Sequence, residues 1–326
     1  MKSRLTDRQK NQIATRNKAP DLTLGSGTVI THHGTELIIE TADGHLLRAT
    51  ARRTLGALTT GDRVGWRTGE DQREIIEQLH PRSNTLIRPD THGKLRLMAA
   101  NIDQVLIVLA PIPWMNPNIV EQAIVATLDL PATPIILLNK IDNLGSIDRQ
   151  DRQQIEATLQ LWQAQDIEIL RVSAHTGEGI AELRTRLADR ISMMIGLSGV
   201  GKTSLARSIT SQAATAAIKA LSTHSQEGQH TTRHSTLFRL DHLPGGLIDA
   251  PGVRDFAVAA RNPLAIDRAF PDILKLAQGC RFNNCSHNQE PNCAVLAALA
   301  EGQLDARRFE NYQTLKRDRS QSPNRS

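Results

Sequence analysis

The chain has few aromatic residues and few cysteines. Its 326 residues include three Trp, one Tyr, five Phe and three Cys. It has no uninterrupted run of 18 apolar residues, which a transmembrane helix would need. The first ten residues also lack the apolar core of a signal peptide. These absences predict a cytoplasmic protein without membrane association, and we expect it to act as a monomer.

Basic residues are concentrated at both ends of the chain. Residues 1–20 carry six Lys or Arg and one Asp, and a second basic group follows residue 306, although the formal net charge is only +5. Such ends favour a polyanionic partner, most simply nucleic acid. Charge alone is equally compatible with solvated tails that only raise solubility. We expect residues 1–20 to be disordered without a partner.

A small β-barrel is predicted over residues 21–82. Its stretches alternate apolar and polar residues, and Asp43-Gly44 is a strong hairpin turn signal. Several short strands in so short a segment favour an OB-fold barrel. Trp66 is the only aromatic residue here, so we expect any RNA contact to depend on charge and shape rather than on base stacking. The predicted strands are 27–31, 36–40, 45–49, 63–67 and 74–77.

Residues 83–262 alternate strands and helices, which predicts a three-layer α/β domain with a largely parallel sheet. A linker is predicted over residues 80–84 and 88–90, and the segment 211–235, rich in Ser, Thr, Ala and Gln, is expected to be mobile. From residue 263 the pattern becomes helical to the end of the chain. The predicted strands of the α/β domain are 105–110, 134–138, 167–172, 191–195, 236–240 and 246–249, and its helices are 119–128, 149–164 and 179–190.

One stretch, Gly196-Leu-Ser-Gly-Val-Gly-Lys-Thr203, fits the phosphate-loop pattern of two glycines spaced by four residues, then Lys and Ser/Thr. It lies between an apolar strand and a helix start, where backbone N–H groups converge on an anion. Lys202 would bridge the outer phosphates and Thr203 would hold Mg²⁺. We expect the nucleotide phosphates at Gly196, Ser198, Gly199, Val200, Gly201, Lys202, Thr203 and Ser204.

Asn139-Lys-Ile-Asp142 follows the strand 134–138 directly. The Asp142 carboxylate can accept two hydrogen bonds from guanine, from N1 and the exocyclic amine, and adenine lacks that donor pair. Asn139 can reach N7 and stiffen the loop, and the Lys140 stem can cover one face of the base. After the next strand, a backbone N–H of Ser173-Ala174 can meet guanine O6. Together these positions predict a guanine site.

Two further segments are expected to respond to the γ-phosphate. Asp249-Ala-Pro-Gly252 ends an apolar strand, and its Asp is placed to hold Mg²⁺ while Gly252 offers its N–H to the phosphate. In the segment 211–235, one hydroxyl of Thr231-Thr232 is expected to close on the magnesium ion. A solvent-facing role for this threonine pair is the alternative.

The order of these motifs is reversed relative to most GTPases, in which the phosphate loop comes first and the base-reading motif last. Here the chain runs from residues 139–142 and 173–174 through the phosphate loop to 231–232 and 249–252. This order indicates a circular permutation. It places the two nucleotide-sensing segments directly before the C-terminal region.

All three cysteines lie within one short window, as Cys280-x4-Cys285-x-His287-x5-Cys293. Three thiolates and one imidazole are the ligands of a closed structural zinc site, with no open position for catalysis. Free structural cysteines are the alternative. The sequence therefore predicts one Zn²⁺ in a helical domain over residues 263–326.

These features together resemble the ribosome small subunit-dependent GTPase A family, a group of circularly permuted bacterial GTPases. The resemblance covers nearly the whole chain: the barrel, Ala100-Asn-Ile-Asp-Gln104, the permuted motif order and the zinc spacing. It implies GTP hydrolysis stimulated by the small ribosomal subunit and a role in the late maturation of that subunit. It also implies that the barrel and the zinc domain contact ribosomal RNA.

The resemblance also points to catalytic residues. Val253 occupies the position where many GTPases carry the Gln that orients the attacking water. The family pattern instead points to His230, and it favours Thr232 over Thr231 as the magnesium ligand; the alternative for His230 is no catalytic role. The sequence departs from the family at Leu197, where a polar residue is common, and at Thr203, where Ser is more usual.

The predicted protein is thus a three-domain, zinc-containing GTPase that binds GTP, Mg²⁺ and the small ribosomal subunit. One alternative is a nucleotide-gated RNA-binding clamp with negligible hydrolysis. A second is another phosphate-loop enzyme, such as a small-molecule kinase, against which the Asn139–Asp142 segment argues.

Overall fold

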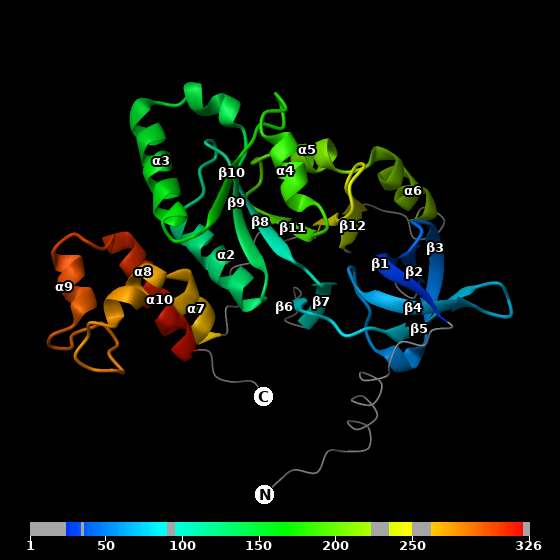
Figure 1. The fold of residues 1–326 in the computed structure, drawn as a ribbon, viewed down its shortest axis with the longest axis horizontal. Helices are drawn as coiled ribbons and strands as arrows, with labels where there is room; N and C mark the ends of the chain where they lie inside the picture. The colour runs from blue at the N-terminus through cyan, green and yellow to red at the C-terminus, as the bar shows by residue number, and fades with distance from the viewer. Residues whose placement is uncertain (1–23, 34–35, 90–94, 223–234, 250–261, 322–326) are drawn as a thin grey trace, which may run out of the picture. The chain divides into compact units, whose positions relative to one another are not determined.

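The computed structural model describes residues 24–33, 36–89, 95–222, 235–249 and 262–321 (Figure 1). The chain folds into two compact units. The first unit comprises Met1–Asp103, Ile180–Met194 and Thr203–Gly252. The second comprises Gln104–Gly179, Ile195–Lys202 and Val253–Ser326. Among the described helices, none is both long and apolar enough to cross a membrane.

The predicted barrel is present in the first unit. Five strands close in the order β1-β2-β3-β5-β4, with β3 and β5 parallel and the other pairs antiparallel. Alternate residues such as Val29, Ile39, Val64 and Ile76 point inward and are completely buried, so they form the barrel core. The strands are β1 (Gly25–His33), β2 (Glu36–Thr41), β3 (Leu46–Ala51), β4 (Arg63–Thr68) and β5 (Glu74–Leu79), with a 3₁₀ turn η1 (Arg53–Leu55) after β3.

The predicted linker is wrong at Arg88 and Pro89, which belong to a strand. Strands β6 (Thr85–Pro89) and β7 (Leu95–Ala100) form an antiparallel hairpin. Pro89 suggested a linker, but it pairs with Leu95 in the last register pair before the connection between the two strands. A proline that donates no hydrogen bond is tolerated at such a strand end.

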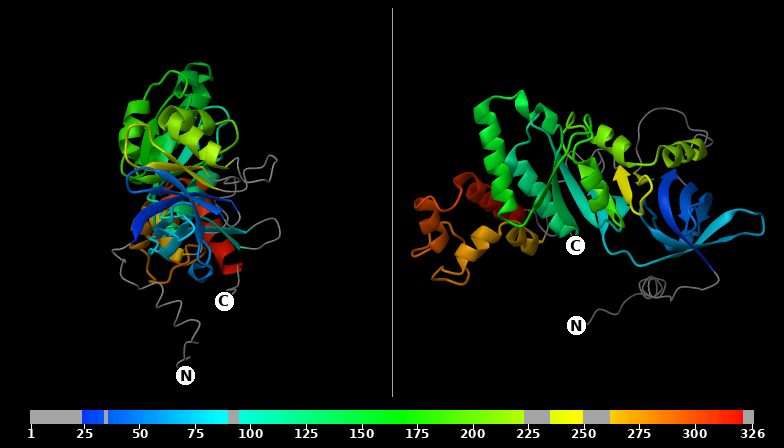
Figure 2. Two further views of the ribbon diagram at one scale, coloured as in Figure 1. Left: turned by 90° about the vertical axis from the view of Figure 1, so that its right-hand side faces the viewer. Right: turned by 45° about the horizontal axis from the view of Figure 1, so that its top comes forward.

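The first unit also contains part of the α/β domain. Strand β11 (Ile191–Ile195) pairs in parallel with β13 (Gly246–Asp249), and β12 (Thr236–Arg239) pairs antiparallel with β13. Strand β12 contacts barrel strand β1, and both views in Figure 2 show the yellow β12–β13 pair beside the blue barrel. The helices here are α4 (Ile180–Leu187), α5 (Lys202–Ile209) and α6 (Gln212–Ser222).

Helix α6 corrects the expectation that residues 211–235 are mobile throughout. Alanine is the strongest helix former, and α6 has the sequence QAATAAIKALS. Its Ile218 is buried, and the helix contacts both β12 and barrel strand β3. Composition alone missed this packing. Residues 223–234 lie outside the described part of the chain.

The second unit holds three parallel strands in the order β10-β9-β8. All six residues of β8 (Gln104–Leu109) are buried, as expected for a strand covered on both faces. Strands β9 (Thr133–Leu138) and β10 (Glu168–Arg171) alternate with helices α2 (Pro117–Asp129) and α3 (Arg149–Gln163) and with a 3₁₀ turn η2 (Ile141–Gly145). The sequence predicted this alternation.

Four helices complete the second unit: α7 (Pro263–Ala269), α8 (Pro271–Ala277), α9 (Ala294–Ala300) and α10 (Ala306–Gln321). Arg308 of α10 is buried, forms two hydrogen bonds with Asp272 (2.8 and 3.0 Å) and one with Glu121 of α2 (3.1 Å). Its guanidinium also lies 4.4 Å from the centre of the Phe270 ring. Because buried charges need such partners, this network fixes the C-terminal helices onto α2.

Candidate nucleotide and metal sites

The phosphate loop adopts a backbone that only glycine tolerates. Gly196, Gly199 and Gly201 have positive φ angles of 150°, 84° and 92°. A Cβ atom on Gly201 would lie 2.3 Å from Asn139 Nδ2, and one on Gly196 would lie 2.4 Å from the Val108 carbonyl oxygen. Gly196 and Gly201 are therefore required by close approach as well as by conformation, and Gly199 by its conformation. This is the strand-to-helix turn in which a phosphate loop binds anions.

Asn139 connects three segments of the second unit. It is buried, its Nδ2 donates to the Val200 carbonyl (2.8 Å), and its Oδ1 accepts from the Ala174 N–H (3.1 Å). Lys140 has a left-handed backbone (φ 60°), and its Nζ donates to the Gly199 carbonyl (2.5 Å). The expected base-reading loop and phosphate loop thus lie together, although about 60 residues separate them in sequence. The two hydrogen bonds of Asn139 link the phosphate loop to the Ser173-Ala174 segment.

Asp142 is exposed, and its carboxylate is oriented by a neighbouring hydroxyl. Ser173 Oγ donates to Asp142 Oδ1 (2.6 Å) and accepts from the N–H groups of His175 (3.2 Å) and Thr176 (3.0 Å). From the sequence, only the backbone of Ser173-Ala174 was expected to take part in the site. The side chain of Ser173 is therefore a positioning group that the sequence pattern did not reveal; a Ser directly after a strand end was its only signal.

Lys202 begins helix α5, and its ammonium lies against the phosphate loop. Its Nζ donates to the carbonyl oxygens of Gly196 (2.9 Å) and Leu197 (2.7 Å). The next two residues, Thr203 and Ser204, are exposed on the first turn of the helix, while Leu205 is buried and anchors it. The loop thus carries a positive charge beside the helix N-terminus, where an anion is stabilised.

The remaining predicted residues are only partly described. Asp249 is exposed at the end of β13, opposite Thr236 in the β12–β13 register. Gly252, His230, Thr231 and Thr232 lie outside the described residues. Their roles remain predictions.

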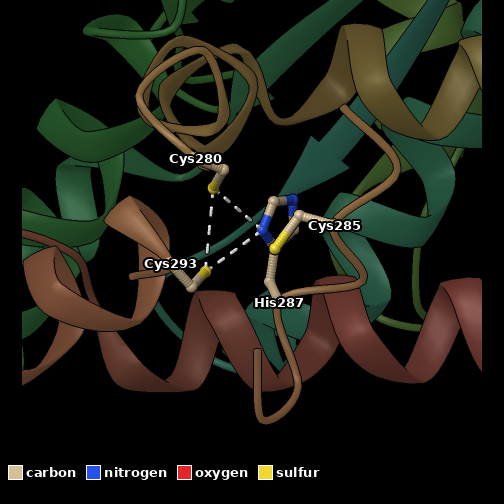
Figure 3. A group of neighbouring side chains, drawn as sticks. All are labelled: Cys280, Cys285, His287 and Cys293. Carbon is tan, nitrogen blue, oxygen red and sulfur yellow. Dashed lines mark hydrogen bonds between the residues drawn. The ribbon is translucent and has the colours of Figure 1, made fainter. Parts of the chain in front are cut away.

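The four predicted zinc ligands converge on one point (Figure 3). Their ligand atoms all lie within 4.8 Å of one another. Cys280 Sγ is 3.7 Å from Cys293 Sγ and 3.6 Å from His287 Nδ1, and Cys293 Sγ is 3.4 Å from the same nitrogen. Tetrahedral zinc with ordinary bond lengths would separate two sulfurs by about 3.8 Å and a sulfur from a nitrogen by about 3.6 Å. The side chains fit Zn²⁺.

Comparison with known proteins assigns the chain to a family. The model of the RsgA GTPase family matches residues 79–259. Two relatives named small ribosomal subunit biogenesis GTPase RsgA are also similar. The one from Pectobacterium carotovorum is 39% identical over 88% of this chain and 82% of its own. The one from Saccharophagus degradans is 38% identical over 96% of this chain and 93% of its own length. This chain belongs to the RsgA GTPase family.

Solved structures agree with this assignment. YjeQ from Thermotoga maritima matches with a TM-score of 0.71 and 26% identity, over 92% of this chain and 99% of that one. YloQ, described as a circularly permuted GTPase, matches with a TM-score of 0.70 and 21% identity, over 94% and 100%. The predicted fold class, a permuted GTPase with a barrel and a C-terminal Cys₃His cluster, is thereby confirmed.

In this member of the RsgA family, further hydrogen bonds fix the loop that carries Cys285 and His287. The Glu290 carboxylate accepts hydrogen bonds from the Ser286 hydroxyl (2.5 Å) and from the N–H groups of Asn288 (2.8 Å) and Ser286 (2.7 Å), which lower its pKa. From α10, Gln313 Nε2 donates to the His287 carbonyl (3.0 Å). Burial lowers the pKa of His287, which favours the neutral imidazole that binds zinc.

We expect Cys293→Ser to abolish zinc binding and to destabilise the C-terminal helices. Removing one thiolate opens a closed four-ligand site, whose metal contributes on the order of 10 kcal/mol in small zinc modules. Elemental analysis should find one zinc per wild-type chain and none in the variant, with a lower midpoint of thermal unfolding. His45→Gln, at an exposed barrel position, is the control. Full zinc content in Cys293→Ser would contradict the assignment.

Proposed function

We propose that this protein hydrolyses GTP to GDP and phosphate when stimulated by the small ribosomal subunit, and that it acts in the late maturation of that subunit. The observation that carries the GTP site is the Asn139 side chain, which bonds to the phosphate loop and to the Ser173-Ala174 loop at once. The subunit is proposed because relatives over most of the chain are named small ribosomal subunit biogenesis GTPases.

In this proposal each part of the GTP molecule has its own contacts. Asp142, oriented by Ser173 Oγ, accepts from guanine, and the Lys140 stem covers the base. The phosphate-loop N–H groups and Lys202 balance the charge that spreads over the γ-phosphoryl oxygens as its bond to the β-phosphate breaks. Thr203, Thr232 and Asp249 would hold Mg²⁺, which neutralises phosphate charge when bound.

His230 is proposed to orient the attacking water, because Val253 replaces the usual Gln and a neutral imidazole accepts a hydrogen bond near pH 7. We expect His230→Ala to remove most of the acceleration by small subunits, about 10²-fold, while GTP affinity stays the same. His242→Ala, at an exposed histidine, is the control. If His230→Ala is stimulated as strongly as wild type, another group positions the water.

Ribosomal RNA is the proposed contact of the zinc domain. Phe282 is 40% exposed, and it is the only exposed Phe, Tyr or Trp side chain among the residues that the structure describes. It lies between two zinc ligands, and the Arg281 guanidinium is 5.4 Å from its ring centre. An aromatic ring beside an arginine suits an unstacked RNA base. We also propose that the protein acts as a monomer in the cytoplasm, with its domains divided at residues 20, 82 and 262.

Titration of GTP hydrolysis with purified small and large ribosomal subunits tests this function. Small subunits should raise kcat and large subunits should not. Single-turnover phosphate release distinguishes the alternative of a nucleotide-gated RNA clamp: such a clamp would bind subunits in a GTP-dependent way but release no phosphate faster with them. Equal stimulation by both subunits would contradict the proposed specificity.

A further inference from the structure

Two barrel hydroxyls bind one backbone carbonyl just before β12. Thr60 Oγ1 donates to the Ser235 carbonyl oxygen (2.7 Å), and Thr31 Oγ1 donates to the same oxygen (3.1 Å). All three residues are buried, with exposed fractions of 0, 1 and 2% for Thr60, Thr31 and Ser235. A carbonyl has two lone pairs, so both bonds can form together. Ser235 follows the proposed magnesium ligand Thr232 by three residues.

The same threonines lie close to the second nucleotide-sensing segment. Thr236 Oγ1 contacts Thr31 Oγ1 (3.4 Å). In the antiparallel β12–β13 pair, Thr236 is the register partner of Asp249, the proposed magnesium ligand at the end of β13. The barrel therefore binds the chain directly next to the strand position opposite Asp249.

Thr60 sits in a rigid, buried turn. Its carbonyl accepts from the Ala100 N–H (2.9 Å), and the adjacent Gly61 has φ 88°, where a Cβ would lie 2.2 Å from the Ala100 carbonyl oxygen. Asp62 is fully buried and forms two hydrogen bonds with Arg82 (2.6 and 2.7 Å). Breaking such a buried pair is costly, so Thr60 moves only with the barrel.

The barrel also binds the chain on the other side of residues 223–234. Arg48 of β3 donates to the Leu221 carbonyl near the end of α6, and Glu40 of β2 forms an ion pair with Arg239 of β12. Both flanks of the segment that carries His230 and Thr232 are therefore bonded to barrel strands, all within the first unit.

We propose that Thr31 and Thr60 are positioning residues for GTP hydrolysis. Their hydroxyls fix the start of β12, and with it the register partner Asp249, so that RNA binding at the barrel is transmitted to a proposed magnesium ligand. In this role they act through β12 rather than by touching the substrate. This inference rests on the proposed function, in which Asp249 helps to hold the magnesium ion and the small subunit stimulates hydrolysis.

The test replaces both hydroxyls in the full-length protein. Thr31→Val with Thr60→Val keeps the side-chain volume and removes both donors, which leaves a buried carbonyl without its partners. We expect kcat with saturating small subunits to fall about tenfold, while the affinities for GDP and for the subunit change by less than about twofold. Thr31→Ser with Thr60→Ser restores the hydroxyls and should restore kcat. Thr68→Val, on exposed barrel surface, is the matched control.

The outcomes separate this inference from the proposed function. Unchanged stimulated kcat in the folded valine variant would overturn the inference and leave the function standing. If small subunits do not stimulate the wild-type protein, the proposed function fails. The role of Thr31 and Thr60 is then tested by the Mg²⁺ concentration that gives half-maximal intrinsic hydrolysis. This concentration should rise about tenfold in the valine variant. An unchanged value would overturn the inference. If the double variant does not fold, Thr60→Val alone is measured in the same way.

Discussion

Replacing Lys202 by Ala is expected to reduce GTP turnover by about 10³-fold, the scale of removing a preorganised charge from a phosphoryl-transfer site. The Lys202 ammonium is held inside the phosphate loop by the Gly196 and Leu197 carbonyls. Without it, the developing charge on the γ-phosphoryl oxygens would lose a side-chain cation that lies in the loop. Turnover is measured as phosphate release at saturating GTP, with and without small subunits.

Two variants control this experiment. Lys275→Ala removes a lysine from an exposed position on α8 and should leave turnover unchanged. Lys202→Arg keeps the charge but replaces a compact ammonium with a planar guanidinium, so it should not restore activity. If Lys202→Ala turns over GTP within about tenfold of the wild-type rate, the phosphate loop is not part of the catalytic site.

Replacing Asp142 by Asn should transfer the preference of the protein from GTP to XTP. In the proposed site the Asp142 carboxylate accepts from two guanine donors, and an amide could not accept both. Xanthine carries a carbonyl in place of the exocyclic amine, and the Asn amide can donate to it. A hydrogen bond to a charged group contributes about 1.5 to 3 kcal/mol, so its loss costs about 10- to 10²-fold in kcat/KM. We therefore expect kcat/KM to fall by that factor for GTP and to rise for XTP.

The contact between Ser173 and residue 142 can be kept in this substitution. Ser173 Oγ donates to Asp142 Oδ1, and an Asn in the same orientation keeps an acceptor there. Asp166→Asn, at an exposed position with a left-handed backbone (φ 59°) that Asn tolerates, controls for the loss of one negative charge. If Asp142→Asn keeps the same preference for guanine, residues 139–142 do not bind the base.

The sequence was sufficient where a local pattern defines the structure. The phosphate loop is bounded by an apolar strand and a helix, and two of its glycines are required by close approach to Asn139 and Val108. The Cys₃His cluster was predictable because every cysteine of the chain shares one window with His287. Both patterns depend on neighbouring residues, so no knowledge of the tertiary structure was needed to find them.

The sequence was insufficient where a residue acts on a distant one. Thr31 and Thr60 bond to Ser235 across 204 and 175 positions, and no sequence spacing predicts such contacts. Composition misjudged α6, because packing of Ile218 orders a segment that is rich in small and polar residues. The β6–β7 hairpin was also missed, because Pro89 indicated a linker. At the end of a strand a proline is compatible with pairing.

The central claim is that residues 139–142 and the phosphate loop bind opposite ends of one guanine nucleotide. A crystal structure with a non-hydrolysable GTP analogue tests it most directly. It should show the guanine N1 and exocyclic amine donating to the Asp142 carboxylate, and the phosphates on the N–H groups of residues 199–203. A base that lies elsewhere on the protein, or phosphates bound away from Lys202, would contradict the claim.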